Sequence, residues 1–149
     1  MSAAMVPVAA ARLTLGPLVF FWPADKQRDF YARIADEAPV DTVYLGQVIC
    51  SKRAPFEEEV HEEARQRLVR AGKKVVRATL GEIMLPRERK QIEAECARDD
   101  GEVEINDAAG LFFRRGRPHR VGPYVNVYNV ETLTRLAVAG ATHFTLVPE

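Results

Sequence analysis

The sequence predicts an α/β fold, a partial (β/α) TIM-type barrel of about six parallel strands. First, short apolar runs typical of buried strands alternate with longer amphipathic, charged stretches typical of helices. Second, strands separated by helices in this way form a parallel sheet with right-handed crossovers. Third, no linker or change of composition divides the chain of 149 residues, which has the length of one domain. One core is therefore expected.

The elements are expected in strict alternation along the chain. Strands are predicted at 13–21, 42–45, 74–80, 102–105, 120–121 and 143–147, and helices at 25–37, 56–71, 86–98, 108–113 and 130–139. The helix at 56–71 has the strongest signal, because glutamates occupy its first turn, arginines lie near its end and Gly72 suits the position after it. Asn129 is expected to cap the last helix, and Gly140 to end it.

Two architectures fit this order: an open doubly wound sheet, or part of a (β/α)₈ barrel, which needs eight strands and typically ~250 residues. The last expected strand has no helix after it, and this favours a truncated barrel. A secretory signal would need a basic residue ahead of its apolar core, and no basic residue precedes Arg12. Residues 1–12 are therefore expected to be a disordered leader, not a secretory signal. Residues 13–149 then form the partial barrel domain.

Composition limits the classes of partner and compartment. The 21 basic residues balance the 21 acidic residues, so no overall field attracts nucleic acid or anionic lipid. No apolar run approaches the ~20 residues of a membrane span. The two cysteines, Cys50 and Cys96, lie far apart without a disulfide framework, which favours a reducing compartment, and a cytoplasmic location is expected.

Common catalytic signatures are absent from the sequence. No G-x-S-x-G elbow is present, which excludes an α/β-hydrolase triad. His61 begins a near miss to the zinc motif H-E-x-x-H, but Arg65 replaces the second histidine and cannot bind zinc, so His61 is expected to be a solvated helix residue. Gly110 and Gly116 have the spacing of a phosphate-binding loop, but Arg117 and Pro118 stand where Lys and Ser or Thr are needed.

Two local features remain as candidates. The basic residues within 114–120 are expected to form a solvated loop, or alternatively an anion- or partner-binding edge that the acidic stretch 93–107 could answer. Cys50 follows the second strand, so it is expected at the carboxyl edge of the sheet, where α/β proteins build their sites. A thiolate is a nucleophile and a metal ligand, and the adjacent Lys52 and Arg53 would favour it. The alternative is a small apolar filler at a strand end.

Several short motifs, in order over residues 13–149, resemble one known family. They are Val43-Tyr44-Leu45-Gly46 followed by Cys50-Ser51-Lys52-Arg53, Leu15-Gly16-Pro17, Phe21-Trp22-Pro23, Glu104-Ile105-Asn106-Asp107, Asn126-Val127-Tyr128-Asn129 and Val147-Pro148-Glu149. Together they are similar to UbiV-like proteins, the oxygen-independent ubiquinone-biosynthesis branch of the collagenase-like peptidase family (peptidase family U-thirty-two).

The resemblance implies a (β/α)-barrel protein that carries a 4Fe-4S cluster and acts with a UbiU-like sister protein in hydroxylating ubiquinone precursors without oxygen. It implies that Cys50 is the first of four cysteine ligands, and that this chain corresponds to the N-terminal half of such a protein. Cys96 stands in no matching motif. A cluster needs four thiolates, and this chain would supply one.

Two other classes of function stay open. The family name suggests a peptidase, for which Cys50 and Ser51 are the nucleophile candidates at the rim, with no general base evident beside them. The third class is a scaffold or fragment without catalytic activity.

Overall fold

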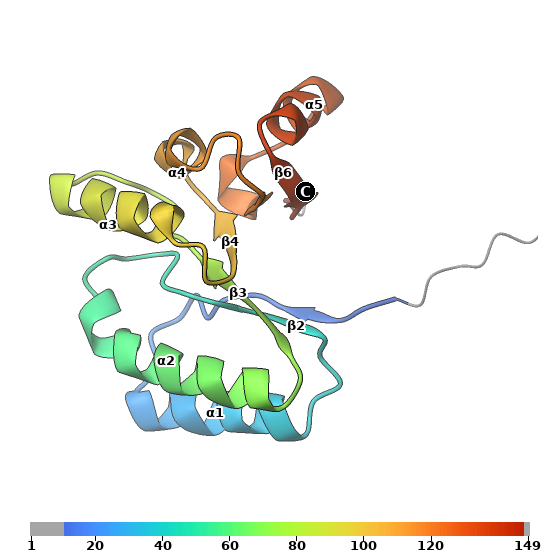
Figure 1. Ribbon diagram of the computed structural model, residues 1–149. Coiled ribbons are helices and arrows are strands. Elements are labelled where there is room, and N and C mark those ends of the chain that lie inside the picture. The colour runs from blue at the N-terminus through green and yellow to red at the C-terminus, as the bar shows by residue number, and fades with distance from the viewer. Residues whose placement is uncertain (1–10, 148–149) are drawn as a thin grey trace, which may run out of the picture.

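A computed structural model describes residues 11–147 and shows a six-stranded parallel sheet with α-helices in the connections (Figure 1). The strands are β1 (Thr14–Leu15), β2 (Thr42–Leu45), β3 (Lys74–Ala78), β4 (Glu102–Ile105), β5 (His119–Val121) and β6 (Ala141–Phe144). The α-helices are α1 (Ala24–Asp36), α2 (Ala54–Arg70), α3 (Pro86–Ala97), α4 (Ala108–Phe113) and α5 (Val130–Val138), and a 3₁₀ turn, η1, covers Pro123–Val125. In these residues no helix has the length and apolar character needed to cross a membrane.

The order of the strands in the sheet identifies the architecture. The strands lie side by side in sequence order from β1 to β6, and every neighbouring pair is parallel. A doubly wound sheet needs a point where the strand order reverses, which this sheet lacks. With right-handed crossovers throughout, a sequential order puts the helices on one side of a sheet that curls toward its other side. The fold is therefore a partial (β/α) barrel.

The apolar core lies between the sheet and the helices. Outward-facing residues of β2, such as Val43 and Leu45, pack with Tyr31 of α1 and Leu68 of α2. Farther along the sheet, Val103 and Ile105 of β4 pack against Ile92 and Cys96 of α3, and Val121 of β5 packs with Val127 and Ala141. Because successive side chains of a strand point to opposite faces, the residues between these apolar ones face the inside of the curl.

Most of the expected elements are confirmed within one or two residues, and two strands differ. The first strand is only Thr14–Leu15, because Gly16 and Pro17 follow at once and proline has no N–H to donate to a ladder. The last strand is Ala141–Phe144, starting two residues earlier than expected, because the chain turns at Gly140 (φ 112°) directly into pairing with β5. Residues 1–10 of the expected leader and Pro148 and Glu149 lie outside the described residues.

Candidate functional site at the carboxyl rim of the sheet

Cys50 lies in the loop between β2 and α2, which leaves the carboxyl end of the sheet. It is a free, half-buried cysteine. Four residues separate it from Leu45, the last residue of β2, and Gly46 begins the loop. The sequence-based placement of Cys50 on this rim agrees with the structure, whereas its role as a metal ligand stays a prediction.

A hydrogen-bonded network anchored on a buried carboxylate fixes the backbone at Cys50. The side-chain carbonyl of Gln47 accepts hydrogen bonds from the backbone N–H groups of Ile49 (2.8 Å) and Cys50 (3.0 Å). The amide of the same side chain donates to Glu57 Oε2 of α2 at 2.6 Å, and Gln27 of α1 donates to the other oxygen at 3.4 Å. Glu57 is only 4% exposed. The loop is thereby tied to both α1 and α2.

A second buried carboxylate ties the same loop to α3. Ser51 Oγ donates a hydrogen bond to Glu88 Oε1, while Glu88 Oε2 accepts from the backbone N–H groups of Met84 and Leu85, both at 2.9 Å. These hydrogen bonds, with Ser51 the largest cause, lower the pKa of Glu88. This contact ties the loop that carries Cys50 to α3.

A polar cluster on the inner face of the sheet lies toward the same rim. Asn106 follows β4, and its side chain donates to the carbonyl of Thr79 at 3.1 Å, while Thr79 Oγ1 accepts from the Asn106 backbone N–H at 3.1 Å. Glu104 Oε1 accepts from Thr145 Oγ1 at 2.9 Å. Burial raises the pKa of Glu104, against the opposing effects of these hydrogen bonds. Gly122 leaves the space for the cluster, since a Cβ there would lie 1.9 Å from Asn106 Oδ1.

Deeper along the strands, the inner face holds an ionic layer. Arg120 of β5 donates to Glu102 of β4 (2.6 Å) and to the hydroxyl of Tyr44 of β2 (2.7 Å), and Glu102 also pairs with Lys74. Barrel interiors are usually filled by Val, Ile and Leu. Here polar and charged side chains occupy the inner face of β4 and β5, so the interior is built for polar contacts.

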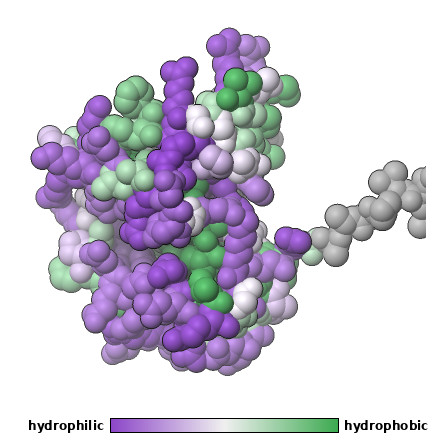
Figure 2. All heavy atoms as spheres, viewed as in Figure 1, coloured by the Kyte–Doolittle hydropathy of each residue, from purple (hydrophilic) through white to green (hydrophobic). Residues whose placement is uncertain are grey.

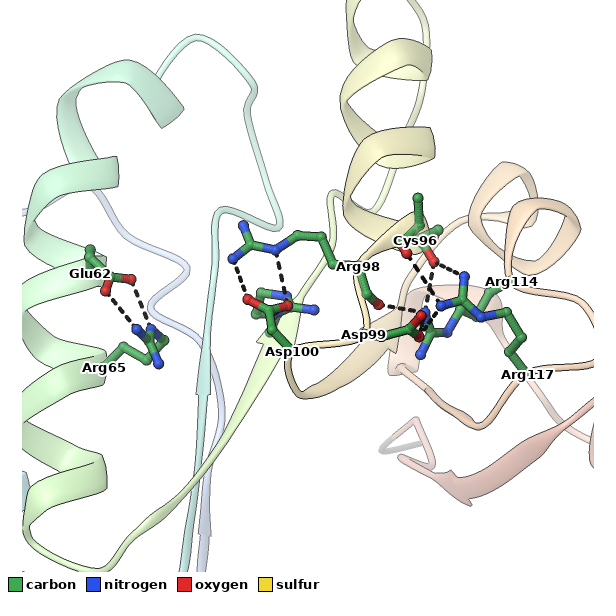
Figure 3. Close-up of polar contacts among 10 residues, drawn as sticks. Glu62, Arg65, Cys96, Arg98, Asp99, Asp100, Arg114 and Arg117 are labelled. Carbon is green, nitrogen blue, oxygen red and sulfur yellow. Dashed lines mark hydrogen bonds and ion pairs between the residues drawn. The ribbon is translucent and has the colours of Figure 1, made fainter.

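The arginine-rich segment and Cys96 lie on the outer side of the sheet, around the end of α3. Arg114 and Arg117 donate to the backbone carbonyl of Cys96 at 2.8 and 2.9 Å, and both pair with Asp99 (Figure 3). The expectation of a solvated loop is wrong for Arg114, whose side chain is 6% exposed. Its guanidinium donates hydrogen bonds to the backbone carbonyls of Cys96 and Arg98. Carbonyls at the C-terminus of a helix have no partner within the helix, so Arg114 stabilises the end of α3.

Cys96 itself is fully buried and packs with Ile92, Val103 and Ile105. Burial raises the pKa of its thiol to about 11. It faces the helix layer, not the inner rim, and takes no part in the candidate site.

His61 also departs from its expected environment. It is half-buried, and its ring meets the ring of Tyr31 edge to face at a centroid distance of 6.4 Å. Burial lowers its pKa. The packing arises because α1 and α2 lie side by side, which one helix's sequence cannot reveal.

The residues in the described range do not fit an iron–sulfur cluster by themselves. Between Ala11 and Val147, no group of three or more His, Cys, Asp or Glu side chains is arranged to hold a metal ion. Cys50 is the one thiol on the rim, and Cys96 lies in the helix-facing core. A four-thiolate cluster would therefore need three ligands from outside this part of the chain.

Sequence reasoning missed the three residues that hold the Cys50 loop: Gln47, Glu57 and Glu88. The available signal was weak. Glu88 occupies the third position of α3 and accepts a hydrogen bond from the backbone N–H of Leu85, which is half of a capping box. Capping boxes are recognised in a sequence by Ser or Thr before the helix, and leucine stands there instead. Gln47 meets Glu57 of α2, and Glu57 also meets Gln27 of α1, so only the packed structure brings these side chains together.

A scan of known protein families and a search of solved structures found no match to this chain.

Proposed function

We propose that this chain is a UbiV-like subunit that supplies one cysteine ligand, Cys50, to an iron–sulfur cluster needed for oxygen-independent hydroxylation in ubiquinone biosynthesis. The partner is a UbiU-like sister protein. The proposal rests on the motif resemblance, and the observation that carries it is the restrained loop around Cys50.

The loop has the properties that a ligand position needs. A cluster ligand must have its backbone held in place while its thiol stays free to bind iron. Here the side chain of Gln47 holds the backbone of Cys50, and Glu57 holds Gln47. The thiol remains half-buried and free. Because neighbouring hydrogen bonds that orient ligands tune metal sites, Gln47 and Glu57 are the supporting residues in this proposal.

Iron content of the complex with the sister protein tests the proposal. The chain is co-expressed with a UbiU-like protein, purified without oxygen, and analysed for iron and for near-ultraviolet absorbance. We expect Cys50→Ala to lose most of the iron and absorbance relative to the unmodified chain. Cys96→Ala is the matched control and should keep both, because Cys96 lies in the outer core.

Two results contradict the proposal. Iron that is unchanged in Cys50→Ala shows that this thiol is not a ligand. An unmodified complex without iron shows that the chain does not contribute to a cluster.

A further inference from the structure

The loops that follow the strands leave the sheet at one end, its carboxyl rim. In Figure 1, α1, α2 and α3 all begin on the left side of the view, so the loops that precede them meet there. These three loops, residues 16–23, 46–53 and 79–85, carry exposed large apolar side chains. We call these side chains the rim patch, and they are Val19, Phe20, Phe21, Ile49, Met84 and Leu85.

Contacts between the loops make the rim patch continuous. Arg53 of the second loop donates to the Val19 carbonyl of the first at 3.1 Å, and its guanidinium lies over the Phe21 ring at 5.8 Å. The backbone N–H of Gly81 in the third loop donates to the Val48 carbonyl of the second at 2.9 Å. The rim patch is therefore one surface, formed by three neighbouring loops.

The largest side chains of the rim patch are well exposed. Phe20 is 74% exposed and Met84 is 75% exposed. By contrast, hydrophilic atoms cover most of α1 and α2 on the face shown in Figure 2. Exposed apolar surface that is gathered in one place marks a site for binding another protein or a membrane.

The chemistry of the rim patch favours a membrane over a protein. Its side chains are hydrocarbon apart from one thioether, and the loop at 16–23 contains no charged residue. Protein interfaces carry about one hydrogen bond per 100–200 Å² of buried area, and these side chains have no strong donor or acceptor to supply one. Lipid chains need no such partner, so they can accept the whole patch.

Basic side chains lie next to the aromatic rings of the rim. Lys26 lies over the ring of Trp22 at 4.2 Å, and Arg53 lies over a phenylalanine of the rim patch. Lys52, beside Arg53, is exposed. Aromatic rings with neighbouring Lys and Arg side chains are typical of the membrane interface, where the cations meet anionic headgroups.

The charge balance of the rim agrees with an anionic surface. Within the three loops, Lys52 and Arg53 stand against a single acidic residue, Glu82. Asp25, in the first turn of α1, pairs with Arg28 at 3.5 Å. Because the whole chain has no net charge, the attraction is local and acts within about 10 Å of the surface at ordinary salt concentrations.

We propose that the carboxyl rim binds the surface of a membrane that contains anionic lipids. The rim patch inserts among the lipid chains, and Lys26, Lys52 and Arg53 meet the headgroups. This binding does not require an iron ligand at Cys50, so it stands apart from the proposed function.

Trp22, the single tryptophan of the chain, lies in the first of these loops and provides the signal for a test. The purified chain is titrated with vesicles of phosphatidylcholine and phosphatidylglycerol, and with vesicles of phosphatidylcholine alone. We expect a blue shift of the tryptophan emission and cosedimentation with the anionic vesicles, and weaker binding to phosphatidylcholine alone. Added salt should weaken binding to the anionic vesicles, because it screens exposed charges.

Variants locate the binding surface. Phe20→Ser combined with Phe21→Ser should weaken binding about tenfold or more, because two rings no longer leave water. Phe112→Ser is the matched control and should bind as the unmodified chain does, since Phe112 is as exposed but lies near the end of α4, away from these loops. Lys26→Glu combined with Lys52→Glu should weaken binding to the anionic vesicles. Cys50→Ala should bind normally.

Four results overturn the proposal. The first is no emission shift and no cosedimentation with either kind of vesicle. The second is an equal loss of binding in Phe112→Ser and in the double phenylalanine variant. The third is equal binding to both kinds of vesicle, which removes the role of anionic lipid. The fourth is a dimer of the chain that binds no vesicles and that the double phenylalanine variant converts to a monomer, which assigns the rim patch to a second copy.

Discussion

Glu104 and Glu102 are two residues apart on the same face of β4, yet their surroundings differ. Burial raises the pKa of Glu104, which is only 2% exposed and has hydroxyl and amide partners. The pKa of Glu102 is lowered, because its hydrogen bonds with Lys74 and Arg120 outweigh the opposing effect of its partial burial. At the scale of single residues, position along the strand decides whether the pKa of a carboxyl group is raised or lowered. The surroundings at each position come from the neighbouring strands.

The pKa of Glu104 makes stability depend on pH. A carboxyl group whose pKa is higher in the folded state binds its proton more tightly there, so its contribution to stability is present at low pH and is lost as pH rises through the folded pKa. Glu104→Gln removes this dependence. We expect the variant to gain stability relative to the unmodified chain between pH 4 and pH 8, measured by thermal unfolding. A constant difference across this range would contradict the raised pKa.

At the scale of elements, two carboxylates on two helices position the loop that carries Cys50. Glu57 lies in the first turn of α2, where acidic residues are expected to complement the helix dipole. It does more than that, because it receives hydrogen bonds from Gln27 and Gln47, and the neighbouring Glu58 and Glu59 are exposed. The three glutamates have the same role by sequence and different roles in the packed structure.

Glu57→Gln should separate these roles. Glutamine presents an N–H where Glu57 accepts hydrogen bonds from two amides, so one buried donor loses its partner. We expect a loss of about 1–3 kcal/mol in the free energy of unfolding by urea. Glu58→Gln is the control and should change it by less than about 0.5 kcal/mol, as is usual for exposed sites. Equal effects of the two changes would show that the network around Gln47 does not hold the loop.

The end of β2 depends on a close approach to β3. Gly46 has a φ of +154°, and a Cβ at this position would lie 2.0 Å from the carbonyl oxygen of Ala78. Gly46→Ala should therefore cost about 2–4 kcal/mol in chemical denaturation, since a backbone atom must move. Gly16→Ala is the control, because nothing lies within 4 Å of a Cβ there. A Gly46→Ala protein as stable as Gly16→Ala would refute this packing.

At the scale of the whole molecule, the sheet curls far enough for strands that are not neighbours to meet. In the sheet, β3 and β4 lie between β2 and β5. The hydroxyl of Tyr44 on β2 nevertheless accepts a hydrogen bond from Arg120 of β5, whose guanidinium lies over the Tyr44 ring at 5.6 Å. This contact spans the inside of the partial barrel between two strands that are not neighbours in the sheet.

Tyr44→Phe tests this contact. It removes only the hydroxyl, and a hydrogen bond to a charged group is worth about 1.5–3 kcal/mol, so we expect a loss of that size in the free energy of unfolding. Tyr128→Phe removes an exposed hydroxyl and should be nearly neutral. If both variants are neutral, Tyr44 and Arg120 do not meet in solution.

The sequence by itself determined the alternation of elements and most of their boundaries. Apolar periodicity and local caps are properties of short segments, which is why Asn129, whose side chain accepts from the N–H of Thr132, and Gly72, with φ 78°, were recognised without a structure. The placement of Cys50 at the rim followed from its position after a strand.

Only the tertiary structure decided between a doubly wound sheet and a partial barrel, because strand order depends on which strands pair. It also decided which charges are buried. Glu57, Arg77 and Arg114 look like solvated residues in sequence, and each acquires its environment from elements that are distant along the chain. Burial of a charged side chain depends on contacts with segments that are distant along the chain. The local pattern around that residue does not specify these contacts.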